Sequence, residues 1–186
     1  MTRRESSAER RARRAAVDDP EVVLQAAARF LEARSRSVTE VRRRLTSAGY
    51  RPELIESAIG RLTELGVLDD EAFARAWVES RDRARPRGEH ALRDELRLKG
   101  IDRSIIDRLL EERRTADPAA PPDRVAAERL IEKHVRALDR IDDPRRRRER
   151  AYALLARNGF DPETCREVAA RVAASAGEEL DPAFPA

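Results

Sequence analysis

Leu45-Thr46-Ser47-Ala48-Gly49 recurs in form at Leu96-Arg97-Leu98-Lys99-Gly100 and at Leu155-Ala156-Arg157-Asn158-Gly159. Each stretch places a leucine four residues before a glycine, with an apolar residue one helical turn before that leucine. Because glycine enters the left-handed conformation without a steric penalty, each of these glycines predicts the end of a helix. Repetition of this kind predicts a tandem array of helical units, which usually works by presenting an extended surface.

Each repeat has the start and stop signals of three helices. Asp19-Pro20 predicts the start of a helix over about 20–35, and Ser37-Val38-Thr39-Glu40 has the spacing of a capping box before the middle helix. Pro52 opens the third helix, and Gly66 ends it. Since apolar residues recur at helical spacing and none alternate with a period of two, we expect an all-α fold. The expected architecture is a tandem array of three three-helix repeats forming a curved, elongated molecule.

The same signals divide the chain into segments. Proline-rich and one-signed charged stretches are typical of linkers and of disordered ends. We therefore expect a basic, disordered tail at 1–19, repeats at 20–66, 67–114 and 123–176, a proline-rich linker at 115–122, and a flexible tail at 177–186.

The composition excludes several classes of protein. Charged residues make up 40% of the 186-residue chain, which disfavours a single thick core and suits thin helical units. One cysteine excludes an intrachain disulfide, and no apolar run approaches the roughly 20 residues that span a bilayer. We expect a soluble, cytoplasmic protein.

Basic charge gathers around the middle helix of each unit. Residues 34–44, 83–99 and 145–157 carry more arginine and lysine than acid, whereas the third helices are neutral to slightly acidic. Such a strip could follow a phosphate backbone or an acidic partner, or it could be a solvated face. A helix-turn-helix reader of duplex sequence is disfavoured, because its recognition helix would need basic residues after the glycine.

Few polar groups could converge for catalysis. His90 and His134 are isolated, so no transition-metal site is expected. Asp69-Asp70-Glu71 could hold a divalent cation, but the same acids suit a helix start, and we favour the cap. Cys165 lies on an apolar stripe, which favours a buried thiol over a nucleophile. Since no glycine-rich phosphate loop occurs either, we expect no enzyme, no cofactor and no metal.

Three aromatic residues have two interpretations each. Tyr50 and Phe160 could stack on the bases of a single strand. They occupy the repeat position of Ile101, which cannot stack, so packing beside the glycine is favoured. Trp77, one turn from Phe73, is likewise expected in the core.

The chain resembles the RecX family of regulatory proteins, which modulate the RecA recombinase. The resemblance covers residues 24–114 strongly and 123–175 more weakly. It rests on Ala28-Arg29-Phe30-Leu31, Arg34-Ser35-Arg36-Ser37, Leu68-Asp69-Asp70-Glu71-Ala72-Phe73-Ala74, Arg85-Pro86-Arg87-Gly88 and Lys99-Gly100-Ile101.

The resemblance implies a stack of three-helix units that contacts the RecA nucleoprotein filament and inhibits its ATPase, strand-exchange and coprotease activities. The alternative is a general DNA-binding protein that acts through the basic strip without a recombinase partner. The expected partners are the RecA filament and the backbone of single- or double-stranded DNA, with the protein acting as a monomer and without a membrane. The charge pattern suggests these contact residues: Arg34, Arg36, Arg42, Arg43, Arg87, Arg93, Arg97, Arg146 and Arg147.

Overall fold

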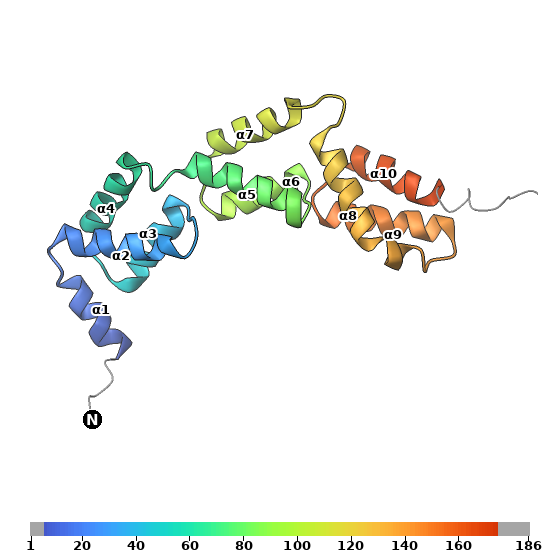
Figure 1. Ribbon diagram of the computed structural model, residues 1–186. Coiled ribbons are helices and arrows are strands. Elements are labelled where there is room, and N and C mark those ends of the chain that lie inside the picture. The colour runs from blue at the N-terminus through green and yellow to red at the C-terminus, as the bar shows by residue number, and fades with distance from the viewer. Residues whose placement is uncertain (1–5, 175–186) are drawn as a thin grey trace, which may run out of the picture. The chain divides into compact units, whose positions relative to one another are not determined.

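The computed structural model describes residues 6–174, and Figure 1 shows the helices that they form. The described residues contain α-helices and no strand, which confirms the predicted all-α helical repeat fold. The helices are α1 (Ser7–Ala15), α2 (Pro20–Glu32), α3 (Val38–Ala48), α4 (Pro52–Glu64), α5 (Asp70–Ala84), α6 (Glu89–Leu98), α7 (Arg103–Thr115), α8 (Pro122–Leu138), α9 (Pro144–Arg157) and α10 (Pro162–Ala174).

The chain divides into two compact units. The first comprises the residues up to Arg75 together with Leu96–Ile105. The second comprises Ala76–Glu95 together with the residues from Ile106 on. Both units draw on α5, α6 and α7, so the division falls within the second predicted repeat.

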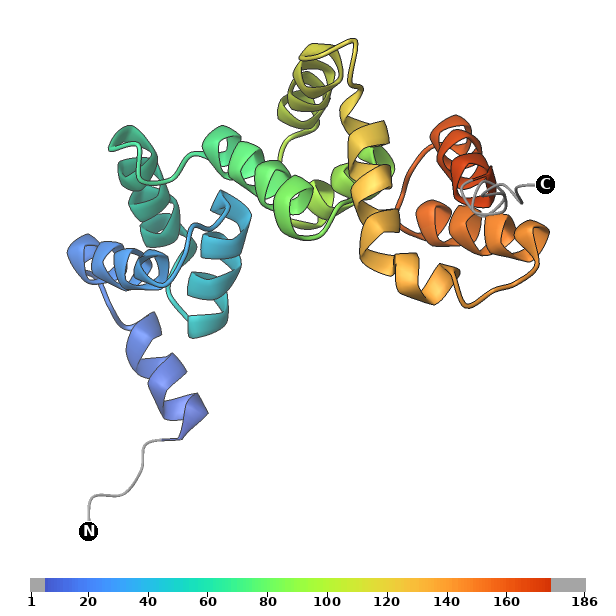
Figure 2. The same cartoon turned by 45° about the vertical axis from the view of Figure 1, so that its right-hand side comes forward.

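The first unit is built on α2, α3 and α4, which pack against one another in Figure 2. Their apolar stripes form one core, and Val23, Ala27 and Val41 are completely buried. Burial of a side chain such as Ile55 stabilises the fold by about 1.5–3 kcal/mol. These are the positions that helical periodicity predicts.

The recurring leucine and glycine close the middle helices as predicted. Gly49, Gly100 and Gly159 have positive φ angles of 99°, 77° and 81°. In each case the leucine carbonyl accepts a hydrogen bond from the residue after the glycine, at 3.3 Å for the Tyr50 amide and the Leu45 oxygen. This six-to-one bond is the mark of a Schellman motif, so the repeated phrase is a helix stop.

The second unit has its main core between α8, α9 and α10. Leu155 and Cys165 are completely buried there, which confirms the buried thiol. Arg113 of α7 links three helices of this unit, because its guanidinium forms ion pairs with Asp82 of α5 at 2.9 Å and with Asp123 of α8 at 2.5 Å. Its side chain is only 10% exposed.

Two backbone segments of the second unit meet at Gly88. The Gly88 amide donates to the Asn158 oxygen at 3.0 Å, and the His90 amide donates to the Gly159 oxygen at 3.2 Å. A Cβ atom at Gly88 would lie 2.2 Å from the Gly159 oxygen. Only glycine allows this close approach.

The expected disordered tail at 1–19 is wrong for residues 7–15, which form α1. Its start is a capping box, because the Ser6 hydroxyl accepts from the Glu9 amide at 3.2 Å and the Glu9 carboxylate accepts from the Ser6 amide at 2.6 Å. Arg11 of α1 donates to the Ser47 oxygen of α3 at 3.2 Å. The expected flexible tail at 177–186 lies outside the described residues.

Candidate partner and nucleic-acid interface

The start of α3 fixes the first part of the predicted strip. The buried hydroxyl of Ser37 accepts from the Glu40 amide at 3.1 Å and donates to the Lys99 oxygen at 2.6 Å. Glu40 also accepts from the Lys99 ammonium at 2.8 Å. Burial alone would raise the pKa of the Glu40 carboxyl. The hydrogen bonds from the Lys99 ammonium and from the Ser37 amide outweigh burial and hold this pKa below its usual value. Glu40 is therefore part of the scaffold of the first unit.

The loop before α3 places two of the predicted arginines differently. Arg34 is exposed and lies 3.5 Å from the Glu40 carboxylate. The Arg36 guanidinium stacks 4.3 Å from the centroid of the Phe30 ring, and its buried Nε atom has no hydrogen-bond partner among residues 6–174. Arg36 thus packs on the first unit, whereas Arg34 is available at the surface.

The middle helix α3 separates its arginines into paired and unpaired groups. Arg42 forms two hydrogen bonds to Glu56 of α4, at 2.7 Å and 2.8 Å, which raise the pKa of Arg42 and lower that of Glu56. Arg43 is exposed and has no ion-pair partner among residues 6–174. Arg43 is therefore the better contact candidate on this helix.

Arg97 and Lys99 complete the predicted strip on the first unit, where Arg97 is exposed. In the second unit, Arg93 of α6 is ion-paired with Asp107 of α7 and lies 3.2 Å from Glu89. Both acids raise the pKa of Arg93, with the Asp107 hydrogen bond the largest cause.

Three predicted arginines remain: Arg87 just before α6, and Arg146 and Arg147 on α9. Arg87 donates to the Asn158 side chain and lies 3.6 Å from Glu95. Arg146 is exposed, 3.6 Å from Asp143. Arg147 is buried and donates twice to the Ile141 oxygen, at 3.0 Å and 2.8 Å, so it closes the loop before α9 and is not presented to a partner.

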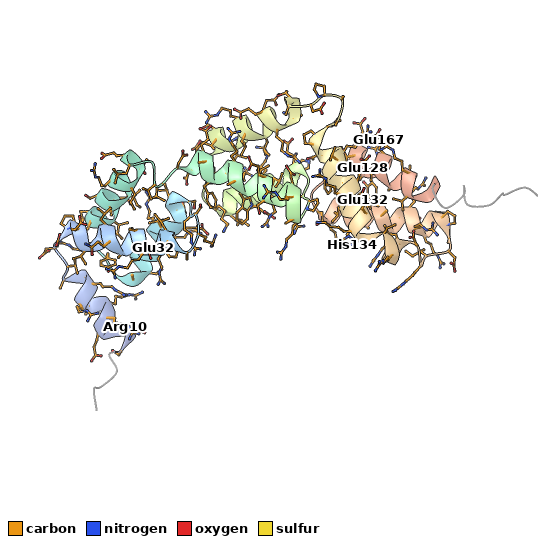
Figure 3. The ribbon with its side chains drawn as sticks, in the orientation of Figure 1. Arg10, Glu32, Glu128, Glu132, His134 and Glu167 are labelled. Atoms are coloured by element: carbon orange, nitrogen blue, oxygen red, sulfur yellow. The ribbon has the colours of Figure 1, made fainter. Side chains whose placement is uncertain are left out.

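A second basic surface, which the charge pattern did not predict, lies within the first unit. It is a cleft of about 1090 Å³ between α1, α2 and α3. We call it the α1 cleft. Its charged and aromatic lining residues are Arg10, Arg11, Arg14, Arg29, Arg44 and Tyr50, and none of the acidic residues within 6–174 lines it. Figure 3 labels Arg10 on α1. The Ser6–Glu9 capping box was the sequence signal for α1, and therefore for this cleft.

The polar residues considered for catalysis have structural positions. Asp69 accepts from the Glu71 and Ala72 amides at 2.8 Å and 3.0 Å, which confirms the helix cap. Asp70 accepts from the Val38 amide at 2.9 Å, and burial raises its pKa. Within residues 6–174, no group of three or more histidine, cysteine, aspartate or glutamate side chains could hold a metal ion.

Two further expectations concern the aromatic residues. Phe160 is buried in the core, as expected. Trp77 was expected in the core, which is wrong in part: it is only partly buried, because its indole N–H donates to the Glu95 carboxylate at 2.8 Å. The Arg81 guanidinium lies 4.4 Å from the Trp77 ring centroid and also binds Glu95 at 2.6 Å. Trp77 therefore belongs to a polar network at the edge of the core.

Across the part of the chain that the structure describes, no helix combines the length and the apolar character needed to cross a membrane.

Two family models match the chain, those of the first three-helix domain of RecX over residues 24–62 and of the second over residues 69–110. The regulatory protein RecX of Mycobacterium sp. (strain JLS) is 37% identical over 135 residues, 71% of each chain. That of Mycobacterium leprae (strain Br4923) is 37% identical over 147 residues, which cover 78% of this chain and 83% of the relative.

The crystal structure of RecX from Lactobacillus salivarius has the same fold, with a TM-score of 0.70 and 21% identity over 83% of this chain and 97% of that chain. Three observations indicate the same family: the helical repeats, the residues that carry the resemblance, and the similarity to these relatives. This chain belongs to the RecX family of regulatory proteins.

Proposed function

We propose that the protein regulates RecA by binding the RecA nucleoprotein filament as a monomer in the cytoplasm. In this proposal it inhibits the ATPase, strand-exchange and coprotease activities of the filament, and so modulates recombination, DNA repair and the SOS response. Membership of a family of regulatory proteins carries the proposal, together with the tandem RecX domains at 24–62 and 69–110.

The described side chains support binding in preference to catalysis. Cys165 is buried, and burial is the largest cause that raises the pKa of its thiol, so it is a poor nucleophile. Asp69 and Asp70 are engaged by backbone amides. We therefore propose a non-enzymatic protein without a cofactor.

Among the predicted contact residues, the exposed ones are the best candidates for the filament surface. Arg34, Arg43, Arg97 and Arg146 are exposed, and we propose that they contact the partner. Arg42, Arg93 and Arg147 are committed to acids or to a carbonyl, so we assign them to the scaffold.

The test is ATP hydrolysis by RecA on single-stranded DNA with this protein added in substoichiometric amounts. We expect inhibition, and we expect the variant Arg43→Gln/Arg97→Gln to require several-fold more protein for the same inhibition. The control, Arg61→Gln/Arg75→Gln, removes the same charge from two exposed positions of the first unit and should inhibit like the wild type. Full RecA activity in the presence of folded protein would overturn the proposal.

The alternative is general DNA binding through the basic strip, which the excess of arginine around the middle helices favours. Under this alternative, the protein would occupy DNA in the same assay while RecA hydrolysed ATP at its normal rate at matched occupancy.

A further inference from the structure

The α1 cleft is distinct from the predicted basic strip. The predicted contact residues do not line it, and α1 precedes the residues that the first family model matches. It is formed where α1 crosses the C-terminal end of α3. A Cβ atom at Gly49 would lie 2.5 Å from the Arg11 side chain, so the helix stop of the first repeat also allows α1 to pass.

Four of the five arginines that line the cleft are not ion-paired within the part of the chain that the structure describes. Arg11, Arg14, Arg29 and Arg44 have no ion-pair partner among residues 6–174. The lack of an ion pair distinguishes these four arginines from Arg42 of α3, which is paired with Glu56. Four such guanidinium groups around one cleft attract a polyanion, and they repel one another in its absence.

The C-terminal end of α3 holds part of this set in place. Arg11 donates to the Ser47 oxygen at 3.2 Å, and Arg14 donates to the Ala48 oxygen at 3.5 Å. Each contact uses one of the five N–H donors of a guanidinium, so donors remain for a ligand. Arg29 of α2 and Arg44 of α3 are exposed on the cleft wall. They are the residues most available to an anion.

Tyr50 gives the cleft an aromatic surface. Its equivalents in the repeat, Ile101 and Phe160, are buried. Tyr50 packs against the core of the first unit, as the sequence favoured, but it is only half-buried and also lines the cleft. The Arg14 guanidinium lies 5.8 Å from the Tyr50 ring centroid. Arginines beside an aromatic ring suit a single-stranded nucleic acid, because phosphates bind the guanidinium groups while a base stacks on the ring.

The volume of the cleft, about 1090 Å³, is that of a pocket for a drug-sized ligand. A volume of this size can take a few nucleotides of one strand. We propose that the α1 cleft binds a short run of single-stranded DNA, with Arg29 and Arg44 on its phosphates and Tyr50 beneath a base. The choice of DNA over RNA rests on the proposed function.

The test is the binding of a fluorescein-labelled oligothymidylate to the full chain, measured by fluorescence anisotropy over a series of KCl concentrations without RecA. For the variant Arg29→Gln/Arg44→Gln, we expect roughly tenfold weaker binding. We also expect a log–log salt dependence flatter by about 0.7 for each phosphate that the variant no longer neutralises. The variant Tyr50→Leu should weaken binding about tenfold and leave the salt slope unchanged.

Two control variants make the result specific. Arg61→Gln/Arg75→Gln has the same net charge as the cleft variant and should bind like the wild type, and Arg29→Lys/Arg44→Lys should restore the salt slope. Wild-type binding and slope in the folded Arg29→Gln/Arg44→Gln variant would overturn the proposal. Tighter binding of a duplex of equal length, or displacement of the strand by polyglutamate at lower concentration than by unlabelled strand, would also overturn it. Since RecA is absent, a negative result here leaves the ATPase test of the proposed function intact.

Discussion

The variant Gly88→Ala tests the close approach within the second unit. Gly88 is buried and has no positive φ, so the alanine backbone itself is not strained there. The added Cβ would lie 2.2 Å from the Gly159 oxygen and 2.4 Å from the Phe160 Cα. Since carbon contacts are optimal near 3.5 Å, the two segments must separate by about 1 Å. Overpacking of this kind costs about 1–3 kcal/mol, and loss of the two backbone hydrogen bonds costs about 1 kcal/mol each. We expect a loss of about 3–5 kcal/mol.

Urea unfolding followed by tryptophan fluorescence measures this loss. The single tryptophan, Trp77, belongs to the second unit and so reports on it. With an m-value of about 2 kcal/mol/M, the midpoint should fall by about 1.5–2.5 M.

The matched control is Gly60→Ala. Gly60 is exposed in α4, and no atom of the described residues lies within 4 Å of an added Cβ, so alanine should stabilise the first unit by about 0.5–1 kcal/mol and leave the tryptophan transition of the second unit unchanged. A Gly88→Ala midpoint within about 0.3 M of the wild type would refute the steric argument.

Three other predictions concern stability and reactivity. Arg113→Met should destabilise the second unit by about 3–5 kcal/mol in the same urea assay, because it leaves two partly buried carboxylates unpaired; a loss below about 1 kcal/mol would contradict this. The low pKa of Glu40 stabilises the fold above its unfolded value of about 4.3, and that contribution is lost as the pH falls through the lower folded value. Glu40→Gln should therefore weaken the dependence on pH, between about 7 and 3, of the urea midpoint of the first unit, followed by circular dichroism, and an unchanged dependence would rule out this role. Cys165 should react with a thiol reagent only as the protein unfolds, and rapid labelling of the native chain would show that the thiol is accessible.

The features that the sequence predicted well, such as helix ends and caps, depend on residues that are close together in the chain. Gly49 and its equivalents end helices because of their conformational freedom, and Ser37 with Glu40 forms a capping box within four residues. Neither depends on distant parts of the chain. The helix α1 had an equally local signal in Ser6 and Glu9, but the run of arginines suggested disorder.

Long-range contacts explain what the sequence did not predict. The approach of Gly88 to Gly159 depends on a segment about 70 residues further on. The same holds for the α1 cleft, because Arg11 and Ser47 come together only once α1 folds back on α3. The periodicity of the sequence therefore does not predict these long-range contacts.

The repeat register explains why a basic middle helix is not the same as a basic surface. Arg42 and Arg93 each lie seven residues before a repeat glycine, and their partners Glu56 and Asp107 lie seven residues after it. The pair therefore joins the middle helix to the third helix in both of these repeats, and its charge is neutralised by the scaffold.

The third repeat places Tyr152 and Arg166 at these two positions, so it lacks this pair, and both residues line a second cleft of about 630 Å³. In the first two repeats, the arginine seven residues before the repeat glycine thus stabilises the fold through its ion pair. Arg29 in the α1 cleft and Arg43 beside the paired Arg42 lie at other positions of the repeat, and they are among the arginines that we propose for contacts with a partner.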